Sequence, residues 1–369
     1  MRIKIFILLC LTVIMQFAGV THLKASHYYY KQLSLKDGVT SAVRCILTDK
    51  QGFVWIGTKA GVSRYDGHEL KKYVHSPNNP QSIPNNLIHQ IAEDEMSNIW
   101  ILTDKGIARY QRQSDDFFLP ADEKGNPIIA YSTCLTKDGV LFGSKDKVYF
   151  YSYRDSSLRL LQKLNKGSNF NISLLSLWDE HTVLCCSRWQ GLVLLDLNTG
   201  KHRLPPFDCG KEIMNMLIDS QNRIWIAPYN EGIKCFTHNG ELVKAYTIHN
   251  SDLSNNVVLS LAEREGKIWI GTDGGGINIL EPKTGRLSLL EHISGGDNYS
   301  LPATSIFCLY NDRNNNMWAG SIRNGLINIR EVSMKTYTEV FPGSNRGLSY
   351  NTVLSLERPY LGGYRRRRY

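Results

Sequence analysis

The 369-residue sequence lacks the features that define several large classes of protein. Its eight cysteines are irregularly spaced, and the seven that follow residue 25 do not form the even set typical of a disulfide framework. Its ten histidines show no metal-ligand spacing, and no CxxC pair or HExxH motif occurs. No stretch shows helical periodicity, and no segment after residue 25 is apolar enough to cross a membrane. The absence of helical periodicity favours a domain built of β-strands.

The excess of positive charge is confined to the two ends of the sequence. The formal net charge is +9. Arg2, Lys4 and Lys24 lie in the first 25 residues and four arginines occupy 365–368, so the remainder carries only +2. A nucleic-acid binder needs a basic surface on its folded part. We therefore expect no nucleic-acid partner.

Residues 1–25 have the layout of a secretory signal peptide. Arg2 and Lys4 precede an apolar stretch from Ile5 to about Val20, and Ala25 stands at a plausible cleavage point. The apolar stretch is shorter than the roughly 20 residues needed to span a bilayer. We expect cleavage and export, with a retained membrane anchor as the alternative.

The rest of the sequence repeats one unit seven times, at spacings of 41–49 residues. A fixed period of this length indicates a repeat architecture. The anchor position is tryptophan in five copies and leucine in two, namely Trp55, Trp100, Leu141, Leu184, Trp225, Trp269 and Trp318. Six residues before each tryptophan stands a carboxylate that we expect to begin a tight turn by accepting backbone N–H bonds. These carboxylates are Asp49, Asp94, Asp219, Glu263 and Asp312.

Each copy reads as four strands. The run "VWIGT" (54–58) alternates β-branched and aromatic residues and is typical of a strand, with one further strand before the turn and two after it. Four strands per unit make one blade of a β-propeller. We predict an all-β, seven-bladed propeller with four-stranded antiparallel blades over residues 26–348. Residues 28–35 should complete the last blade, and 336–342 should compete for that edge or lead outward.

These repeats resemble the two-component regulator propeller repeat. The resemblance rests on "GFVWIGTKAGVSRYDG" (52–67), "KIWIGTDGGGINIL" (267–280), "SIPNNLIHQI" (82–91) and "DLSNNVVLSL" (252–261), and it covers about residues 28–356. It implies the periplasmic sensor of a hybrid two-component system in a polysaccharide-degrading bacterium. Such proteins carry further sensor regions, a membrane span and a histidine kinase, which this sequence lacks. A homodimer is an additional expectation.

The end of the sequence departs from the repeat. The segment "SYNTVLSL" (349–356) repeats "SNNVVLSL" (254–261), so an eighth copy begins, but the four arginines at 365–368 match no copy. Codons permitted for "RPYLGGYRRRRY" (358–369), read one base out of frame, encode "VRIWVGTDGGG", which is the repeat motif. We expect 349–369 to be an aborted next blade with an out-of-frame basic tail, and the chain to be a fragment of a longer sensor.

No constellation of residues indicates catalysis, and we expect neither a cofactor nor a metal. The segment "TDGGGIN" (272–278) looks like a phosphate loop, but no helix follows it, so we interpret it as a hairpin. One function is a sensor that binds an oligosaccharide without chemistry. Another is a propeller enzyme acting on glycans, which needs two carboxylates converging at the channel mouth. A protein-interaction scaffold is the third. Because the acidic residues recur as turn residues, we favour sensing.

A sugar site is expected on the loops that follow each "WIGT" run, which share one face with the inter-blade loops. Three copies depart there from the consensus "TDGG", namely "SRWQG" (187–191), "PYNEG" (228–232) and "SIRNG" (321–325). The aromatic side chains Trp189 and Tyr229 can stack on a pyranose ring. The polar ones can donate hydrogen bonds to hydroxyls or a uronate, and these are Arg188, Asn230, Arg323 and Asn324. The alternative is ordinary loop variation.

Overall fold

The computed structural model describes residues 27–39, 42–122, 124–164, 170–210, 212–290, 301–332, 353–355 and 363–364. The chain divides into two units, of which Tyr29–Arg330 is the propeller. The described part of the other unit includes a two-stranded pairing of β29 (Val353–Ser355) and β30 (Gly363–Tyr364). The predicted signal peptide, the segment 336–342 and most of the predicted eighth copy lie outside the described residues. No helix in the described ranges has the length and apolar character of a membrane span.

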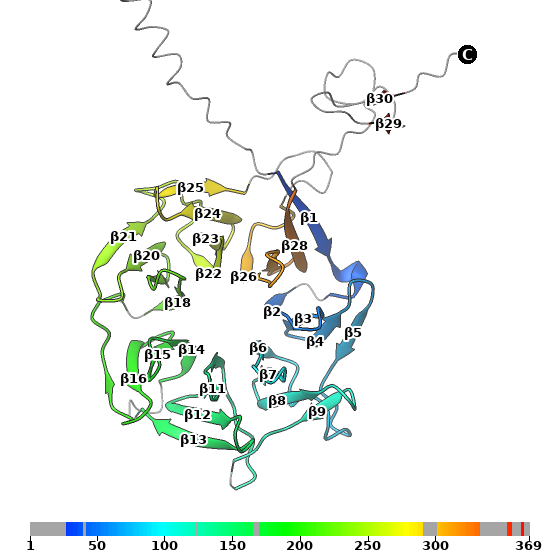
Figure 1. The fold of residues 1–369 in the computed structure, drawn as a ribbon, viewed down its shortest axis with the longest axis vertical. Helices are drawn as coiled ribbons and strands as arrows, with labels where there is room; N and C mark the ends of the chain where they lie inside the picture. Colours follow the sequence, from blue (N-terminus) through cyan, green and yellow to red (C-terminus); the bar gives the residue numbers. More distant parts are fainter. Residues whose placement is uncertain are drawn as a thin grey trace, which may run out of the picture. The chain divides into compact units, whose positions relative to one another are not determined.

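Seven four-stranded antiparallel sheets are arranged as the blades of a ring, as predicted (Figure 1). Blade one contains β2 (Val43–Thr48), β3 (Val54–Thr58), β4 (Gly61–Tyr65) and β5 (Leu70–Tyr73). Blade two contains β6 (Ile88–Glu93), β7 (Ile99–Thr103), β8 (Gly106–Gln111) and β9 (Asp116–Phe118). Blade three contains β10 (Ser132–Leu135), β11 (Gly139–Gly143), β12 (Lys147–Ser152) and β13 (Leu158–Lys163).

The next three blades repeat this order from the innermost to the outermost strand. Blade four contains β14 (Ile172–Leu177), β15 (Thr182–Ser187), β16 (Gly191–Asp196) and β17 (His202–Arg203). Blade five contains β18 (Ile213–Ile218), β19 (Ile224–Pro228), β20 (Ile233–Phe236) and β21 (Leu242–Tyr246). Blade six contains β22 (Val258–Arg264), β23 (Lys267–Thr272), β24 (Ile277–Glu281) and β25 (Arg286–Leu289).

Blade seven is completed by the N-terminal end of the propeller. Its strands are β26 (Ile306–Asn311), β27 (Met317–Ser321), β28 (Leu326–Val332) and, at the outer edge, β1 (His27–Leu33). A short 3₁₀ turn, η1 (Leu35–Asp37), follows β1. The prediction that residues 28–35 complete the last blade is therefore confirmed for the strand β1. Closing the ring with a strand from the opposite end of the chain removes an exposed sheet edge.

The repeated tryptophan occupies the same place in five blades, on the second strand and opposite the innermost strand. The pairs Leu47↔Trp55 and Tyr310↔Trp318 show this register in the first and last blades. The small residue two positions later is needed for close packing between blades. A Cβ at Gly57 would lie 2.4 Å from the Cys45 sulfur and 2.8 Å from Ile88 of blade two. These contacts bury the anchors between neighbouring sheets.

In four blades the aspartate before the tryptophan begins the turn and also bonds to the indole. Asp49 Oδ1 accepts hydrogen bonds from the backbone N–H groups of Gln51 (3.0 Å) and Phe53 (2.9 Å), as predicted. Its Oδ2 also accepts from Trp55 Nε1 at 2.9 Å. The same indole bond forms in three other blades, at Asp94–Trp100, Asp219–Trp225 and Asp312–Trp318. Each of these buried aspartates is thus hydrogen-bonded within its own blade, and Asp49 also accepts from Arg112 Nη1 of blade two at 3.1 Å.

The prediction for Glu263 is wrong. Glu263 lies within β22, and the hairpin of blade six turns at Glu265 and Gly266, both with positive φ. Its turn is shorter than that of blade one, so the residue six before the tryptophan still belongs to the strand. Its carboxylate instead accepts the backbone N–H of Ser220 in blade five at 2.7 Å. Glu93 accepts the N–H of Lys50 in the same way at 2.8 Å, so both glutamates join neighbouring blades.

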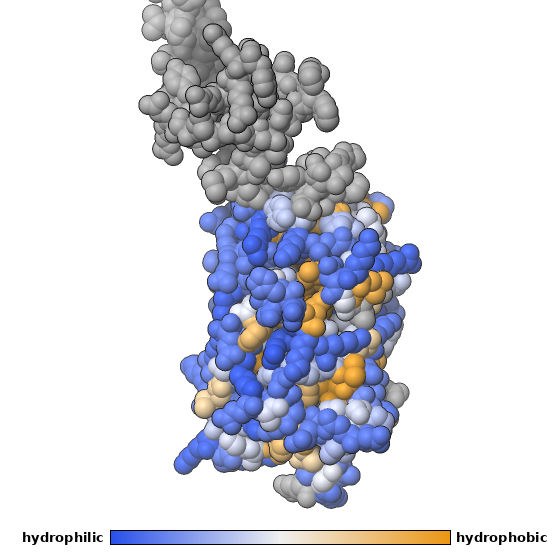
Figure 2. Space-filling view, turned by 90° about the vertical axis from the view of Figure 1, so that its right-hand side faces the viewer, coloured by the Kyte–Doolittle hydropathy of each residue, from blue (hydrophilic) through white to orange (hydrophobic). Residues whose placement is uncertain are grey.

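The outer surface of the propeller is mainly polar. Figure 2 shows scattered apolar side chains among hydrophilic ones on the side of the molecule that it presents. Exposed large apolar side chains of the described residues include Met96 and Phe118 of blade two. Single exposed apolar residues are normal on a soluble protein.

Candidate functional site

The loops between the second and third strands lie beside the inter-blade loops, as expected. The backbone N–H of Gly61 donates to Asn86 O at 2.9 Å in blade one. In blade five the N–H of Tyr229 donates to Glu212 O at 2.7 Å. The N–H of Ile213 donates to Arg188 O of blade four at 3.0 Å. One face of the propeller, called here the loop face, therefore carries both sets of loops.

Trp189 and Tyr229 project from consecutive blades on the loop face. They are 62% and 50% exposed, and among the tryptophan and tyrosine side chains in the described part of the propeller only these two are exposed. Both loops bond to the segment Glu212–Ile213, so they flank the same piece of chain. The two rings make no ring contact with each other among the described residues. Asn230 follows in the turn with a φ of 57°.

Arg188 lies against its neighbour on the loop face. Its guanidinium is 5.1 Å from the centre of the Trp189 ring, and its Nη2 lies 3.1 Å from the Met214 sulfur. A guanidinium over an aromatic face is a favourable arrangement that restricts both side chains. The predicted residues of blades four and five are therefore grouped in the structure.

The predicted residues of blade seven are not part of this group. Arg323 and Asn324 are exposed on the loop between β27 and β28, with blade six between them and blade five. The backbone N–H of Asn324 donates to Ser321 Oγ at 2.6 Å, and its carbonyl accepts from Gln32 Nε2 at 2.7 Å. No described contact joins either residue to Trp189 or Tyr229.

A second set of polar and aromatic side chains, which are candidates for binding, lies at the starts of the innermost strands near the loop face. His89 Nε2 is 2.7 Å from Asp104 Oδ1, and the His89 ring meets Tyr131 edge-on at 5.1 Å. Across the ring closure, the Arg44 guanidinium is 5.2 Å from the centre of the Phe307 ring. Sequence reasoning missed this set. The sequence does hold a signal for this set, because its members share one position in the repeat. Each is the second residue of an innermost strand, namely Arg44, His89, Met214 and Phe307.

The seven cysteines of the described residues pack in the core and are not reactive groups. Burial raises the pKa of Cys45 to about 12 and that of Cys134 to about 11. Cys185 and Cys186 are fully buried within β15. Thiols in this state stay protonated and are poor nucleophiles.

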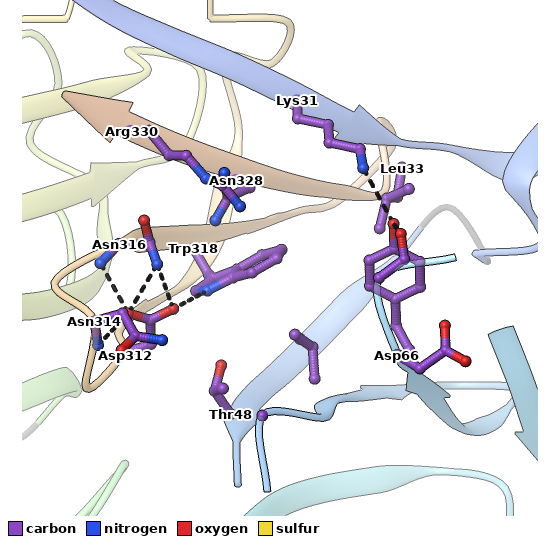
Figure 3. Close-up of a pocket in the computed structure, with 14 residues that line it drawn as sticks. Lys31, Leu33, Thr48, Asp66, Asp312, Asn314, Asn316, Trp318, Asn328 and Arg330 are labelled. Carbon is purple, nitrogen blue, oxygen red and sulfur yellow. Dashed lines mark hydrogen bonds between the residues drawn. The ribbon is translucent and has the colours of Figure 1, made fainter. Parts of the chain in front are cut away.

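A pocket of about 240 Å³ lies between blades seven and one (Figure 3). Asn328 is 2% exposed and its Nδ2 finds no hydrogen-bond partner among the described residues. The Thr48 hydroxyl, also buried, has none either. Lys31 Nζ donates to the Tyr65 hydroxyl at 3.2 Å, and Arg330 Nε donates to Asn328 Oδ1 at 2.6 Å. The sequence analysis did not single out any of these residues.

Three segments of the chain match the two component regulator propeller family, at residues 37–60, 252–274 and 300–323. Each segment contains the first two strands of a blade, in blades one, six and seven. A comparison with curated protein sequences finds no match.

Several solved structures share the fold. The extracellular domain of one hybrid two component system from B. thetaiotaomicron is 20% identical, with a TM-score of 0.69 over 85% of this chain and 43% of that one. A second such domain from the same organism is 21% identical, with a TM-score of 0.66 over 85% and 41%. Virginiamycin B lyase from Staphylococcus aureus is 12% identical, with a TM-score of 0.60 over 83% and 100%. The chain thus spans less than half the length of the two sensor domains. Three segments of this chain match the two component regulator propeller family, and its propeller shares the fold of part of each of these two extracellular domains.

Proposed function

We propose that this propeller is a periplasmic, ligand-sensing module of a two-component signalling system, and that it binds an oligosaccharide released from a polysaccharide. The observation that carries the proposal is the exposure of Trp189 and Tyr229 on consecutive blades. A soluble domain gains stability by burying such rings, so exposed ones on a single face are typical of an interaction site. Their flat faces suit the C–H face of a pyranose.

The polar groups beside the rings suit a sugar. Arg188, held over Trp189, keeps N–H groups that can donate to ring hydroxyls, and Asn230 offers an amide in the next loop. Two exposed rings on adjacent blades, Trp189 and Tyr229, favour an oligosaccharide over a monosaccharide. Because Arg323 and Asn324 lie apart from this group, they join only a ligand that reaches across the central channel.

Sensing is favoured over glycan cleavage because of how the carboxylates are used. The turn aspartates are occupied by backbone and indole donors, and Asp104 is bonded to His89. Glycoside hydrolysis needs two carboxylates placed on either side of one bond. The enzyme and the interaction scaffold remain the alternative functions.

The signal would pass to regions that lie outside this chain. The sensor domains with the same fold are more than twice as long as the part that this chain matches. We propose that the longer protein is exported, anchored in the inner membrane and joined to a histidine kinase, and that pairing of two copies transmits binding.

Isothermal titration calorimetry with a panel of plant and host oligosaccharides tests the proposal. We expect one class to bind, and Trp189→Ala or Tyr229→Ala to raise its Kd about fivefold to thirtyfold, which corresponds to about 1–2 kcal/mol per ring. Phe118→Ala is the matched control, because it removes an exposed ring from the outer strand β9. Binding that is equally strong in Trp189→Ala and the wild type would place the site elsewhere.

A further inference from the structure

We propose that the pocket between blades seven and one binds a single sugar acid, meaning one polyhydroxylated ring that carries a carboxylate. This site is separate from Trp189 and Tyr229 and does not depend on the loop-face proposal. The argument rests on the origin of the pocket, on the unpartnered groups inside it and on the charges at its opening.

The corresponding space is filled between blades one and two. Arg64 pairs across the sheet with Trp55, and its guanidinium lies 5.8 Å from the centre of the indole. Its Nη1 donates to the Tyr110 hydroxyl of blade two. Blade two repeats the arrangement, since Arg109 Nη1 donates to the Tyr151 hydroxyl of blade three at 2.9 Å. An arginine opposite the tryptophan therefore closes the gap between neighbouring blades.

Blade seven has a shorter side chain at this position. Asn328 pairs with Trp318 as Arg64 pairs with Trp55. Tyr65 of blade one stands where Tyr110 stands in blade two, because both pair with the first residue of the second strand. Asn328 does not reach it, and Lys31 of the outer strand donates to Tyr65 instead. The pocket is the volume that the missing guanidinium leaves open.

Two buried groups in the pocket lack partners. Asn328 Nδ2 and Thr48 Oγ1 belong to side chains that are 2% and 7% exposed, and neither makes a hydrogen bond among the described residues. Figure 3 shows them on either side of the Trp318 indole. A buried polar group without a partner is destabilising, so a bound molecule that accepts from Asn328 and bonds to Thr48 would be held strongly.

The two cationic side chains at the opening of the pocket favour a ligand with several oxygen acceptors. Lys31 and Arg330 are exposed, and each makes one side-chain hydrogen bond among the residues that the structure describes, which leaves further N–H groups for a carboxylate. Asp312 offers no acceptor, since its oxygens take the Trp318 indole N–H and the Asn316 backbone N–H, both at 2.8 Å. Donors therefore outnumber acceptors, which favours an anion.

The remaining lining separates a sugar acid from a simple anion. Asp66 Oδ1 accepts the backbone N–H groups of His68 and Glu69, and its second oxygen can accept from a hydroxyl of the ligand. A volume of about 240 Å³ equals about eight water molecules at roughly 30 Å³ each. A volume of this order matches one sugar ring.

Calorimetry with sodium galacturonate tests the proposal directly. We expect saturable binding of galacturonate, and at least tenfold weaker binding of galactose, which lacks the carboxylate, and of acetate, which lacks the hydroxyls. Absence of galacturonate binding to the wild type would overturn the proposal, as would binding of acetate with equal affinity.

Two variants locate the site. Asn328→Arg restores the residue that closes the gap in blades one and two, so we expect it to abolish galacturonate binding while the melting temperature stays at or above the wild-type value. Lys31→Met, at an exposed position, should raise the Kd at least tenfold. Arg323→Met is the matched control that removes an exposed cation from the loop face of the same blade. Wild-type affinity in Asn328→Arg would refute the site.

The Trp189→Ala variant separates this proposal from the loop-face site. It should retain full galacturonate affinity while losing affinity for an oligosaccharide. Loss of both ligands in Trp189→Ala would mean that the sugar acid binds on the loop face and not between blades seven and one.

Discussion

The junction between blades one and two differs from the junction between blades seven and one, although both are built from the same repeat. At the first, Asp115 accepts from the Tyr73 hydroxyl at 2.6 Å and from Lys71, and Tyr110 joins the same group. At the second, the only hydrogen bond between side chains of the two blades among the described residues is that from Lys31 to Tyr65. The comparison shows that the buried tryptophans preserve the fold of the blade at both junctions. The residue opposite the tryptophan can differ between copies, and this changes the side chains that line the junction.

Among substitutions at the two junctions, removing the arginine that fills the first one should have the largest effect on stability. We expect Arg64→Ala to lower the free energy of unfolding by about 3 kcal/mol, because it leaves a cavity beside Trp55 and removes the hydrogen bond from Arg64 to the Tyr110 hydroxyl. Asn328→Ala at the second junction should change it by less than about 1 kcal/mol, because its amide N–H groups already lack a partner. Urea unfolding followed by tryptophan fluorescence measures both. Equal losses would contradict the comparison.

The acidic group at the first junction should make that junction sensitive to pH. Burial raises the pKa of Asp115, but hydrogen bonds from Lys71, Tyr110 and Tyr73 outweigh burial and lower the pKa to about 2. A lowered pKa stabilises the fold above the unfolded value of about 3.9, and this contribution is lost as the pH falls toward 2.

Asp115→Asn should therefore cost stability at neutral pH and not in acid. We expect about 1 kcal/mol at pH 7, a value reduced for solvent screening because the side chain is 30% exposed. Melting temperatures of the variant and the wild type should converge between about pH 5 and pH 2. A difference that persists unchanged to pH 2 would show that geometry, and not charge, is responsible.

Filling the second junction should have a smaller effect on stability. We expect Asn328→Arg to leave the free energy of unfolding unchanged or to raise it by up to about 1 kcal/mol, because a guanidinium over the Trp318 ring gains a cation–π contact. Differential scanning calorimetry measures the change. A loss of more than about 2 kcal/mol would show that the pocket does not accommodate the longer side chain, as overpacking is destabilising.

The fold could be predicted from the sequence because its determinants are periodic. Trp55 and Trp318 occupy equivalent places because each blade packs against its neighbours in the same way, so the same residue types recur at the same positions. The closure by β1 was predicted from the likeness of two distant segments. Glu263 was misassigned because a hairpin one residue shorter changes which position begins the turn, and spacing from the tryptophan does not show this.

The sites were less predictable because they depend on what differs between copies. Trp189 and Tyr229 stand out as departures from the loop consensus, so the sequence could place them on one face. The pocket at Asn328 depends on the absence of an arginine that only two other copies carry at that position. Which side chains then face an empty volume is a three-dimensional property that emerges when blades seven and one meet.

The smallest expected effect concerns the loop face. Trp189→Ala should change the free energy of unfolding by less than about 0.5 kcal/mol, because the side chain is 62% exposed and its removal leaves no cavity. Trp55→Ala, the same substitution at a buried anchor, should cost about 3–5 kcal/mol. Thermal unfolding of both variants provides the measurement. A large loss in Trp189→Ala would mean that the ring supports the loops of blades four and five, and a fall in oligosaccharide affinity could then no longer be assigned to lost stacking.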